Sequence, residues 1–509
     1  MRTEVLIVGA GPTGLALAAQ LIRYEVDFVI VDKKESTTPY SKAIGVQART
    51  LEIYEQFGLA DPLIERGWIA GKVRLVEGGE VRGQVDLSNV GQGLSQYPFL
   101  LIVEQGQHEA LLNDFIRSHQ RDVRWLTELE SFSQDQTGVT AELKNTAGER
   151  ETIEAKYLVA CDGAHSLVRR ELGIDFGGST FERLFYVADV EIDWQFSHDA
   201  LHVCLAQSTI TAFFPMKGDR RWRIVGTFPE GHKTDEGEIL YEEIEKQIIA
   251  DTELKLDITD VNWFSVYKVH SRHVSKFSEG RCFLAGDSAH IHTPAGAQGM
   301  NTGIQDGYNL AWKLAAALKS GAGEKLLATY NEERLPNAHR LLQTTDRIFQ
   351  FGASDEAVVA FFRTKIFPYI ANLALNIDAV KNFIFPLISQ IGINYHDSSL
   401  SSGGRGFNVK AGDRMPYIEI EGESIYKRLH EPRFHLLVFW DGSGPRPDAS
   451  TGLDRLFDVN VFPLYPKVVE TFGTSQTFTV LLRPDNYVGY ISAGADIEEA
   501  RSYLNRVLR

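Results

Sequence analysis

The sequence predicts an α/β fold in three parts: a parallel sheet with helices, an antiparallel sheet inserted into it, and a small α/β domain at the C-terminal end. Short β-branched runs at 4–9 and 26–31 enclose a helical pattern, which is the order of a βαβ unit with parallel strands. Alternating strands with turn signals occupy 72–90 and 181–228, which indicates the inserted antiparallel sheet. The Ser- and Gly-rich stretch 396–406 is the best linker candidate, and new strands follow it.

These signals divide the chain into predicted segments, because the chain leaves the parallel sheet and later returns to it. In sequence order, the segments are the parallel-sheet domain over 1–71, inserted strands over 72–98, the parallel-sheet domain again over 99–180, the inserted sheet domain over 181–270, the parallel-sheet domain with a helical region over 271–395, and the C-terminal domain over 403–509.

Length and composition describe an ordinary multidomain globular protein. A chain of 509 residues is long for one hydrophobic core. Its content of 43% hydrophobic and 24% charged residues is typical of globular proteins. The net charge of −16, with no long basic block, argues against a nucleic-acid partner. Cys161, Cys204 and Cys282 lie far apart, so we expect neither a disulfide framework nor a zinc site, and we expect a reducing compartment.

The apolar N-terminal run VLIVGAGPTGLALAAQL resembles the core of a signal peptide. However, Glu4 precedes it, no cleavage-like polar region follows, and Gly-Pro-Thr-Gly interrupts it. No other stretch reaches the uninterrupted apolar length that a bilayer requires. We therefore expect a cytoplasmic protein without a membrane partner.

A first phosphate site is predicted at the N-terminus. Gly9, Gly11 and Gly14 form Gly-x-Gly-x-x-Gly between a strand and a helix. The first glycine permits a tight turn, the second lets a diphosphate approach the backbone, and the third lets the helix pack closely on the strand. The N–H groups at the start of the helix then bind the anion.

Asp32 ends the second strand, 23 residues after Gly9, where an acid accepts hydrogen bonds from a ribose. A carboxylate at this place disfavours a 2′-phosphate, so the adenosine half resembles that of FAD or NAD and not that of NADP. The chain contains one such fingerprint. We therefore expect one tightly held dinucleotide and a second nucleotide that binds transiently elsewhere.

A second ligand site is predicted in the stretch RCFLAGDSAHIHTPAGAQGMNTGIQDGYNLAWKL, a strand, a loop of small residues and an amphipathic helix. Asp287 follows the strand, where a carboxylate can bind the hydroxyls of an extended sugar alcohol. Gly296 and Gly299 keep the loop thin, so N–H groups near Met300 and Asn301 can face a ring that becomes anionic on reduction. FAD fits both sites, whereas NAD has neither the ribityl chain nor the anionic reduced ring.

Three motifs in this order, GAGPTG, CDGAHSLVRRELG and GDSAHIHTPAGAQGMNTGIQD, closely resemble the class A FAD-dependent aromatic monooxygenases, which have the p-hydroxybenzoate hydroxylase fold. The resemblance covers about residues 1–390 and implies a Rossmann-like (GR2-type) FAD-binding domain with an inserted antiparallel β-sheet substrate domain. From about residue 403, with LLRPDNYVGYIS as the matching stretch, the chain resembles the thioredoxin-like domain of phenol and polyketide hydroxylases. This domain contains no cysteine, which excludes thiol–disulfide chemistry, so its expected role is structural or the formation of a homodimer.

The resemblance and the residue patterns together assign the cofactor-binding residues. The diphosphate is assigned to Gly9, Gly11, Pro12, Thr13 and Gly14, with Lys42 where relatives often carry Arg, and the adenosine is assigned to Asp32, Lys33 and Leu129. The ribityl-phosphate region is assigned to Gln105, the ribityl chain to Gly286 and Asp287, and the isoalloxazine ring to Pro294, Gly299, Met300 and Asn301. Asp162 and Gly163, with Arg169 nearby, are expected to support both FAD and the visiting NAD(P)H.

Simpler structural interpretations remain open for several of these residues. Arg169 is most simply a solvated residue of a helix that Ser166 caps, Asp162 could only end a strand in a turn, and Gln105 could be plain polar surface. His290 and His292 form a His-x-His pair, but without further ligands at suitable spacing we expect packed histidines and no metal.

The resemblance implies an NAD(P)H- and O2-dependent monooxygenase that hydroxylates an aromatic, phenolic or polyketide small molecule through a C4a-hydroperoxyflavin. The catalytic residues are unknown; His202, Tyr267 and His270 are candidate bases by residue type, and Phe213, Phe214, Trp222 and Trp263 are candidate pocket residues, although packing explains each of them as well. The alternatives are a Baeyer–Villiger-type or antibiotic-modifying oxygenase, a flavin reductase or halogenase, and a non-catalytic flavin-binding redox sensor. The tryptophan-rich signature and the active-site lysine pattern expected of halogenases are not found in the sequence.

Overall fold

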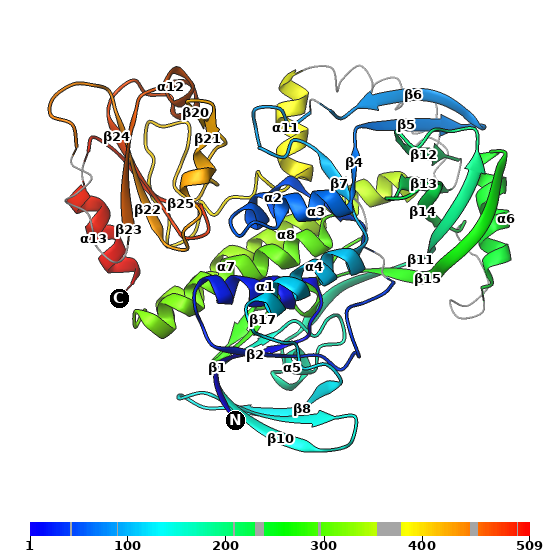
Figure 1. Cartoon of the computed structure of the whole chain (residues 1–509), viewed down its shortest axis with the longest axis horizontal. Helices are drawn as coiled ribbons and strands as arrows, with labels where there is room; N and C mark the ends of the chain where they lie inside the picture. Colours follow the sequence, from blue (N-terminus) through cyan, green and yellow to red (C-terminus); the bar gives the residue numbers. More distant parts are fainter. Residues whose placement is uncertain are drawn as a thin grey trace.

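A computed structural model of the chain describes residues 1–40, 43–88, 90–206, 209–229, 239–293, 297–353, 378–447, 457–495 and 497–508. Three parts lie next to one another (Figure 1): the parallel sheet with its helices, the large sheet on the right, and the C-terminal domain on the left. Lys42 and Pro294, both predicted at the cofactor site, lie outside the described residues.

The first part is a seven-stranded sheet with the central order β16-β17-β10-β1-β2, which the antiparallel strands β8 and β9 extend beyond β10. Strands β1, β2, β10 and β17 run parallel, which confirms the predicted βαβ unit. The strands are β1 (Arg2–Val8), β2 (Phe28–Val31), β8 (Thr127–Gln134), β9 (Val139–Asn145), β10 (Arg150–Ala160), β16 (Ser278–Glu279) and β17 (Cys282–Leu284).

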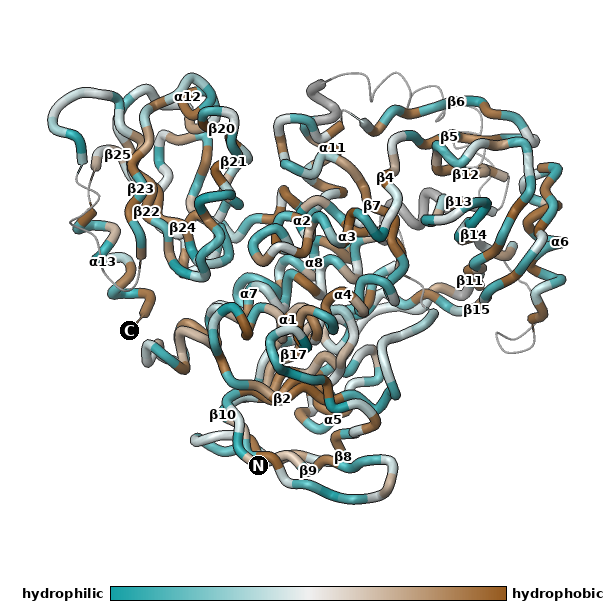
Figure 2. The backbone as a smooth tube through the Cα atoms, in the orientation of Figure 1, coloured by the Kyte–Doolittle hydropathy of each residue, from teal (hydrophilic) through white to brown (hydrophobic). Residues whose placement is uncertain are grey.

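Helices cover this sheet, and a short three-stranded sheet lies beside them. Strand β1 has no exposed side chain from Val5 to Ile7, because a parallel strand between two layers is buried on both faces. Figure 2 shows the hydrophobic residues concentrated along these central strands. The elements are α1 (Pro12–Arg23), α2 (Ala48–Glu55), α3 (Ala60–Arg66), α4 (Gln105–Ser118), α5 (Leu167–Glu171), η1 (Gly286–Ser288), α7 (Gly299–Lys319), α8 (Glu324–Ala353), α11 (Asp378–Ile388), β3 (Gly45–Val46), β4 (Trp68–Ala70) and β7 (Leu100–Ile102).

The second part is an eight-stranded sheet with the order β18-β15-β11-β14-β13-β12-β5-β6, antiparallel except between β12 and β5. The early strands β5 and β6 therefore join the later ones, as the sequence predicts. Helix α6 (Tyr241–Thr252) packs on one face of it with Tyr186, Phe213 and Trp222. The strands are β5 (Lys72–Glu77), β6 (Glu80–Asp86), β11 (Phe176–Trp194), β12 (Leu201–Leu205), β13 (Ile210–Pro215), β14 (Arg221–Thr227), β15 (Leu256–Val274) and β18 (His290–Ile291).

The C-terminal part has its own sheet, with the order β19-β25-β24-β22-β23. Strands β22 and β23 are parallel, as are β19 and β25, whereas β24 runs antiparallel to both of its neighbours, β22 and β25. The predicted thioredoxin-like assignment stays a prediction. The elements are β19 (Ser402–Gly403), β20 (Glu419–Ile420), β21 (Glu423–Ser424), η4 (Ile425–Arg428), β22 (Phe434–Trp440), β23 (Phe457–Pro463), α12 (Pro466–Phe472), β24 (Phe478–Leu482), β25 (Val488–Ala493) and α13 (Ile497–Val507).

The predicted linker at 396–406 is anchored to the rest of the protein. Ser398 Oγ donates to Glu333 at 2.8 Å, and Ser399 Oγ donates to Glu332 at 2.8 Å. Strand β19 then pairs with β25 of the C-terminal sheet. Its small polar residues, which suggested a free linker, satisfy the carboxylates of α8 instead.

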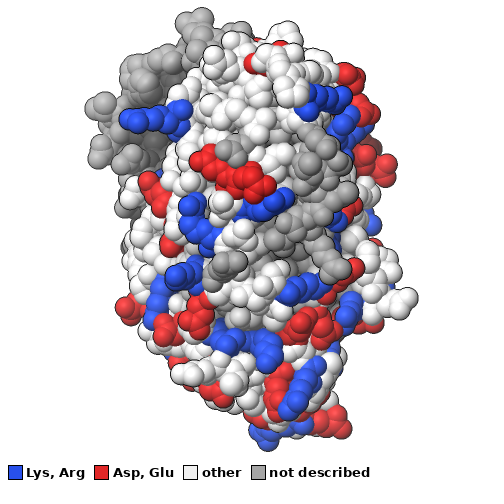
Figure 3. All heavy atoms as spheres, turned by 90° about the vertical axis from the view of Figure 1, so that its left-hand side faces the viewer, with Lys and Arg blue, Asp and Glu red and all other residues white. Residues whose placement is uncertain are grey.

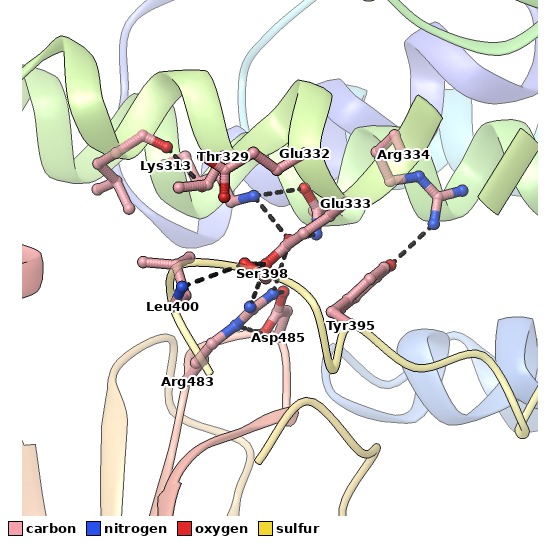
Figure 4. A network of polar contacts seen from close by, with 12 residues as sticks. Lys313, Thr329, Glu332, Glu333, Arg334, Tyr395, Ser398, Leu400, Arg483 and Asp485 are labelled. Carbon is pink, nitrogen blue, oxygen red and sulfur yellow. Dashed lines mark hydrogen bonds and ion pairs between the residues drawn. The ribbon is translucent and has the colours of Figure 1, made fainter. Parts of the chain in front are cut away.

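Buried charges join the C-terminal domain to helices α7 and α8 (Figure 4). Glu333 of α8 forms ion pairs with Lys313 of α7 at 2.8 Å and with Arg483 after β24. Arg483 also pairs with Asp485, which accepts a hydrogen bond from Trp312 Nε1 at 3.1 Å. All these side chains are almost fully buried. Two positive and two negative charges therefore neutralise one another at the contact between the domains.

The surface of the C-terminal side carries both signs of charge. Figure 3 shows acidic and basic side chains interspersed over this face. Among the described helices, none combines the length and the apolar character needed to cross a membrane.

We expect the substitution Glu333→Gln to lower the free energy of unfolding by about 3–5 kcal/mol, because Lys313 would lose its ion-pair partner and Asp485 alone would remain in this cluster to balance the two buried cations Lys313 and Arg483. Urea unfolding measures the loss. The neighbouring Glu332→Gln is the control, since Glu332 is exposed and should change the value by less than about 1 kcal/mol. Equal effects of both substitutions would contradict the role given to the buried cluster.

Candidate functional site

Four predicted residues lie at one edge of the parallel sheet. Gly9 follows β1, Asp32 follows β2, Asp162 follows β10 and Asp287 follows β17. These strands are neighbours in the order β17-β10-β1-β2 and run parallel, so their carboxyl ends meet at the same edge. Ligands of open α/β sheets bind there.

The three glycines of the first motif serve different purposes. Gly9 has φ +105°, and a Cβ on it would lie 2.2 Å from the carbonyl oxygen of Cys161, which directly follows the neighbouring strand β10. A Cβ on Gly14 would lie 2.0 Å from the Gly9 carbonyl oxygen. A Cβ on Gly11 would meet no atom within 4 Å. The protein's own packing thus requires Gly9 and Gly14, whereas Gly11 faces open space that a ligand can use.

The first turn of α1 is not capped. Gly11, its N-cap, has no side chain, and Pro12 at the first helical position has no N–H. The first helical hydrogen bond runs from Leu15 N to Gly11 O at 3.0 Å. The N–H groups of Thr13 and Gly14 are therefore left without an intrahelical partner, which is the property of an anion-binding helix start.

Asp32 is held next to the glycine motif. Its Oδ2 accepts from Ala10 N at 2.7 Å and its Oδ1 accepts from Lys34 N at 2.9 Å. Each carboxylate oxygen keeps a further lone pair for a ribose hydroxyl. Lys33 is exposed, whereas Leu129 is 4% exposed and packs into the core.

Gln105 lies at the start of α4 and bonds within its own helix. Its Nε2 donates to Glu109 Oε1 at 2.7 Å, and Thr38 N donates to the other oxygen of Glu109 at 2.7 Å. Glu109 is fully buried, while Gln105 is half-buried. Gln105 therefore keeps one amide hydrogen and its carbonyl oxygen for another partner.

Asp162 is placed at the sheet edge by the start of α5. Its Oδ2 accepts from Leu167 N at 2.8 Å, while its Oδ1 is buried and has no hydrogen-bond partner in the part of the chain that the structure describes. Burial raises the pKa of this carboxyl group. Gly163, the next residue, has φ +79°. A buried polar atom without a partner is costly, so this oxygen marks a place where a ligand donor fits.

The simplest interpretation of Arg169 as a solvated helix residue is wrong. Arg169 is 6% exposed, and its guanidinium donates to Ser288 O at 2.9 Å and to Ala164 O at 2.7 Å. It also stacks on Phe176 at 3.9 Å. The side chain ties α5 to the loop that carries Asp287, whereas Ser166 caps the helix as predicted.

The loop after β17 places Asp287 at an open position. Gly286 has φ +62°, and Asp287 follows it with an exposed side chain. Among the described residues, none forms a hydrogen bond or ion pair with its carboxylate. The protein around this group nevertheless disfavours its charge: desolvation raises its pKa, and Asp306 adds to the rise. A carboxylate that solvent reaches but protein surrounds is suited to bind ligand hydroxyls.

Thr13 joins the two predicted sites. A Cβ on Gly286 would lie 2.4 Å from Thr13 Oγ1, and a Cβ on Gly303 of α7 would lie 2.3 Å from the same atom. One turn later, a Cβ on Gly307 would lie 3.2 Å from Leu17 Cβ. Helices α1 and α7 therefore run parallel in close contact, and both begin on the same side of the molecule.

The first turn of α7 is also uncapped. Gln298, its N-cap, makes no side-chain cap, and Thr302 N is bonded to Gln298 O at 2.9 Å. The N–H groups of Met300 and Asn301 precede that bond, and among the described residues no hydrogen-bond partner is recorded for them. This is the second anion-binding helix start at the site.

The side chain of Asn301 is a structural anchor. Its Oδ1 accepts from Gln47 N at 2.9 Å and from Thr50 Oγ1 at 2.8 Å. Its Nδ2 donates to Gly45 O at 3.0 Å and to Ala297 O at 2.8 Å. The backbone of Asn301 therefore serves the ligand, while the side chain fixes the segment before α2.

Asp306 and Arg334 escaped the sequence analysis. Asp306 Oδ1 pairs with Arg334 Nε at 2.6 Å, and its Oδ2 accepts from Gly286 N at 2.9 Å and from His290 Nε2 at 2.7 Å. Burial alone would raise the pKa of Asp306, but Arg334 and His290 lower it to about 2. The signal available in the sequence was an acidic residue, Asp306, within the helix that follows the glycine loop. Its partners could not be read from the sequence, because Arg334 and His290 come from other elements.

The candidate bases on the large sheet have different environments. His202 is buried on the α6 side between Phe196 and Trp222, and burial lowers its pKa to about 4. His270 lies 2.9 Å from Thr180 Oγ1. Tyr267 is half-buried beside Phe185, and burial raises its pKa to about 12.

The candidate pocket residues divide between the two faces of this sheet. Phe213 and Trp222 pack against α6, away from the parallel sheet. Phe214 packs with residues of the short three-stranded sheet, and Trp263 stacks on Tyr40 at 6.0 Å. Only Phe214 and Trp263 therefore face the part of the protein that carries the cofactor site.

Comparison with known protein families gives a match over most of the chain. The model of a family described as FAD binding domain matches residues 2–345.

Individual relatives match over nearly the whole length. A flavin-dependent monooxygenase of Mycobacteroides abscessus is 32% identical over 99% of this chain and 100% of its own. A 6-methylpretetramide 4-monooxygenase of Streptomyces rimosus is 32% identical over 87% of this chain and 80% of its own. Among solved structures, an aromatic hydroxylase from angucycline biosynthesis is 28% identical, with a TM-score of 0.77 over 98% of both chains.

We expect Gly303→Ala to weaken FAD retention and to destabilise the protein by about 1–3 kcal/mol, because the added methyl group would overlap Thr13 Oγ1. The double substitution Thr13→Ala with Gly303→Ala should recover part of this loss, since the nearest remaining side-chain atom is Cβ of residue 13, at 3.6 Å. Thermal unfolding and bound flavin per protein measure both. If the double substitution instead loses as much stability and flavin as the two single substitutions added together, the contact between Thr13 and Gly303 does not set the spacing of α1 and α7.

Proposed function

The chain belongs to the FAD binding domain family, among the flavin-dependent monooxygenases, and we propose that it hydroxylates an aromatic or polyketide small molecule with NAD(P)H and O2. One observation carries the proposal: two uncapped helix starts, those of α1 and α7, lie in contact at one sheet edge together with Asp32 and Asp287. This arrangement fits a long dinucleotide with a diphosphate, a sugar-alcohol chain and a ring that carries negative charge.

Each end of FAD has its own partners in this proposal. The N–H groups of Thr13 and Gly14 hold the diphosphate, and Asp32 holds the adenosine ribose. Asp287 accepts hydrogen bonds from the ribityl hydroxyls, and the N–H groups of Met300 and Asn301 stabilise negative charge on the ring. Bound FAD supplies the transfer of electrons from NAD(P)H and of one oxygen atom from O2.

The aromatic substrate class rests on the large sheet and on the relatives. Phe214, Trp263 and Tyr267 lie on the sheet side that faces the FAD-binding part, where flat rings can pack against them. One relative is named as a 6-methylpretetramide 4-monooxygenase, and one solved structure as an aromatic hydroxylase. Both names support oxygen transfer to a cyclic, electron-rich substrate.

The reductant, the compartment and the oligomeric state are further proposals. We infer that NADPH or NADH visits transiently, since the chain has one dinucleotide fingerprint. The three cysteines are free, which supports a cytoplasmic protein. A homodimer is proposed through the C-terminal domain, and sedimentation velocity tests it.

The activity is tested with the purified, FAD-loaded chain. Oxidation of NADH and NADPH is followed with and without a panel of phenols and polycyclic phenols, together with peroxide formation and product mass. Faster oxidation that yields a product with one added oxygen supports the monooxygenase. Tight flavin without turnover of any aromatic would instead favour a flavin-binding sensor.

We expect Asp287→Ala to weaken FAD binding by about 10–100-fold, since hydrogen bonds to a charged acceptor contribute about 1.5–3 kcal/mol. Asp287→Asn should lose less, because its amide oxygen still accepts hydrogen bonds. Quenching of flavin fluorescence measures the affinity. The control is Asp219→Ala, whose carboxylate is 98% exposed and distant in sequence from the loop. Unchanged affinity in Asp287→Ala would remove the ribityl assignment.

A further inference from the structure

A buried arginine of the C-terminal domain, Arg414, contacts three other parts of the chain. Its Nη1 donates to Glu52 Oε1 of α2 at 3.1 Å. Its Nε donates to Ile391 O, shortly after the end of α11, at 3.2 Å, and its Nη2 donates to Leu94 O, in the loop before β7, at 3.0 Å. The side chain is 7% exposed. It is not one of the FAD contacts of the proposed function.

The backbone of Arg414 belongs to the C-terminal domain. It forms a β-bridge with Tyr487, which lies between β24 and β25. Arg414 Nη1 also donates to the hydroxyl of Tyr426 in η4 at 2.9 Å. One side chain therefore fixes this domain to α2, to the loop before β7 and to the segment that follows α11.

Glu52 lies between two buried arginines. Its Oε1 accepts from Arg414 and from Ser95 Oγ, the latter at 2.7 Å, and its Oε2 accepts from Arg49 Nη1 at 3.1 Å. Arg49 Nη2 also donates to Asp485 O of the C-terminal domain at 3.0 Å. One carboxylate thus faces two guanidinium groups, and carbonyl oxygens of neighbouring loops accept from both. Because a buried charge is costly without such partners, the two arginines determine where these loops lie.

Helix α2 also holds the start of α7. Thr50, which follows Arg49 directly, donates from Oγ1 to Asn301 Oδ1 at 2.8 Å. The backbone N–H of Gln47, just before α2, donates to the same oxygen at 2.9 Å. The side chain of Asn301 is fully buried. The position of α2 therefore determines the position of the Asn301 backbone.

The segment 387–391 holds the first turn of α7 as well. Gln298, the N-cap of α7, donates from Nε2 to the first carbonyl oxygen of this segment at 3.1 Å. Gln390 donates from Nε2 to Thr302 Oγ1 at 2.8 Å. The N–H of Thr302 makes the first helical hydrogen bond of α7, to Gln298 O. Both residues that close the first turn are thus bonded to this segment.

Two routes therefore lead from Arg414 to the start of α7. The first runs through Glu52 and α2, and the second runs through Ile391, which directly follows Gln390. The two routes are joined to each other, because Arg49 N donates to the carbonyl oxygen of residue 389 at 3.2 Å.

We propose that Arg414 is a positioning residue for the flavin-ring site, which holds α2 and segment 387–391 so that the N–H groups of Met300 and Asn301 face the ring. This inference rests on the proposed function, because it takes the start of α7 as the ring site. Donors that are fixed before the charge develops stabilise it most. The C-terminal domain then completes the FAD site without a reacting group of its own.

Hydrogen exchange in the full-length, FAD-loaded protein tests the positioning directly. The amides from Thr302 to Gln305 are bonded within α7 and exchange when its first turn opens. We expect Arg414→Ala to speed their exchange by about 10-fold, the equivalent of one lost hydrogen bond. The amides around Trp312, further along the same helix, should keep their rates. Equal acceleration along the whole helix would overturn the proposal.

A second variant covers the case in which Arg414→Ala does not fold. Arg414→Lys keeps the positive charge beside Glu52, but an ammonium group cannot replace the planar fork that reaches Ile391 O and Leu94 O as well. We expect this variant to fold and to speed the same exchange, by less than Arg414→Ala. Exchange at the wild-type rate in Arg414→Lys would overturn the proposal.

A matched control separates positioning from a general loss of stability in the C-terminal domain. Phe472 is fully buried in the core of that domain, where it packs against Phe439 and Phe478. Phe472→Leu should lower the temperature of thermal unfolding and leave the exchange at the start of α7 unchanged. The same acceleration in this control as in the Arg414 variants would assign their effect to stability alone.

The link to the ring is tested by the reduction potential of bound FAD, which gives the affinity for reduced FAD relative to oxidised FAD. We expect this ratio to fall about 10-fold in Arg414→Ala and to stay unchanged in Phe472→Leu, because the N–H groups at α7 stabilise the anionic reduced ring. Faster exchange with an unchanged ratio would overturn the assignment of Arg414 to the ring site. If the wild-type protein takes up no FAD, the proposed function fails, and exchange in the FAD-free chain still decides whether Arg414 positions α7.

Discussion

The contact of α1 with α7 at Thr13 is the constraint on which the site depends. Gly286 and Gly303 both lie too close to Thr13 for a side chain, so the two helices and the cofactor loop meet at one point. Their parallel direction places two uncapped helix starts on the same side. Two motifs that are separated by more than half of the chain thereby form one site for one long ligand.

Buried charges hold this arrangement from behind. Glu333 and Arg334 are neighbours on α8, yet they serve different partners: Glu333 pairs with Arg483 of the C-terminal domain, and Arg334 pairs with Asp306 beneath the cofactor loop. The C-terminal domain is therefore linked through one helix to the residues that position Gly286. A domain without cysteines can in this way contribute to the site without chemistry of its own.

The two faces of the large sheet have different roles: one packs against α6, and the other faces the cofactor side. The α6 face carries aromatic residues and His202 in a closed core, and the opposite face carries Phe214, Trp263 and Tyr267 toward the cofactor side. Because strand side chains alternate, Phe213 and Phe214 point to opposite faces although they are adjacent. Residue type alone could not assign either of them to a pocket.

The sequence by itself determined the features that depend on local spacing: the βαβ unit, the glycine motif, Asp32 and Asp287 at strand ends, and the uncapped start of the helix after Gly299. These depend on backbone conformation and on neighbours within one or two turns. The burial of Arg169, the anchoring of residues 396–406, and the chain from Arg334 through Asp306 to His290 were decided only by the tertiary structure. Each of them joins groups that are distant along the chain, and a polar side chain is buried only where such a distant partner offsets the loss of water.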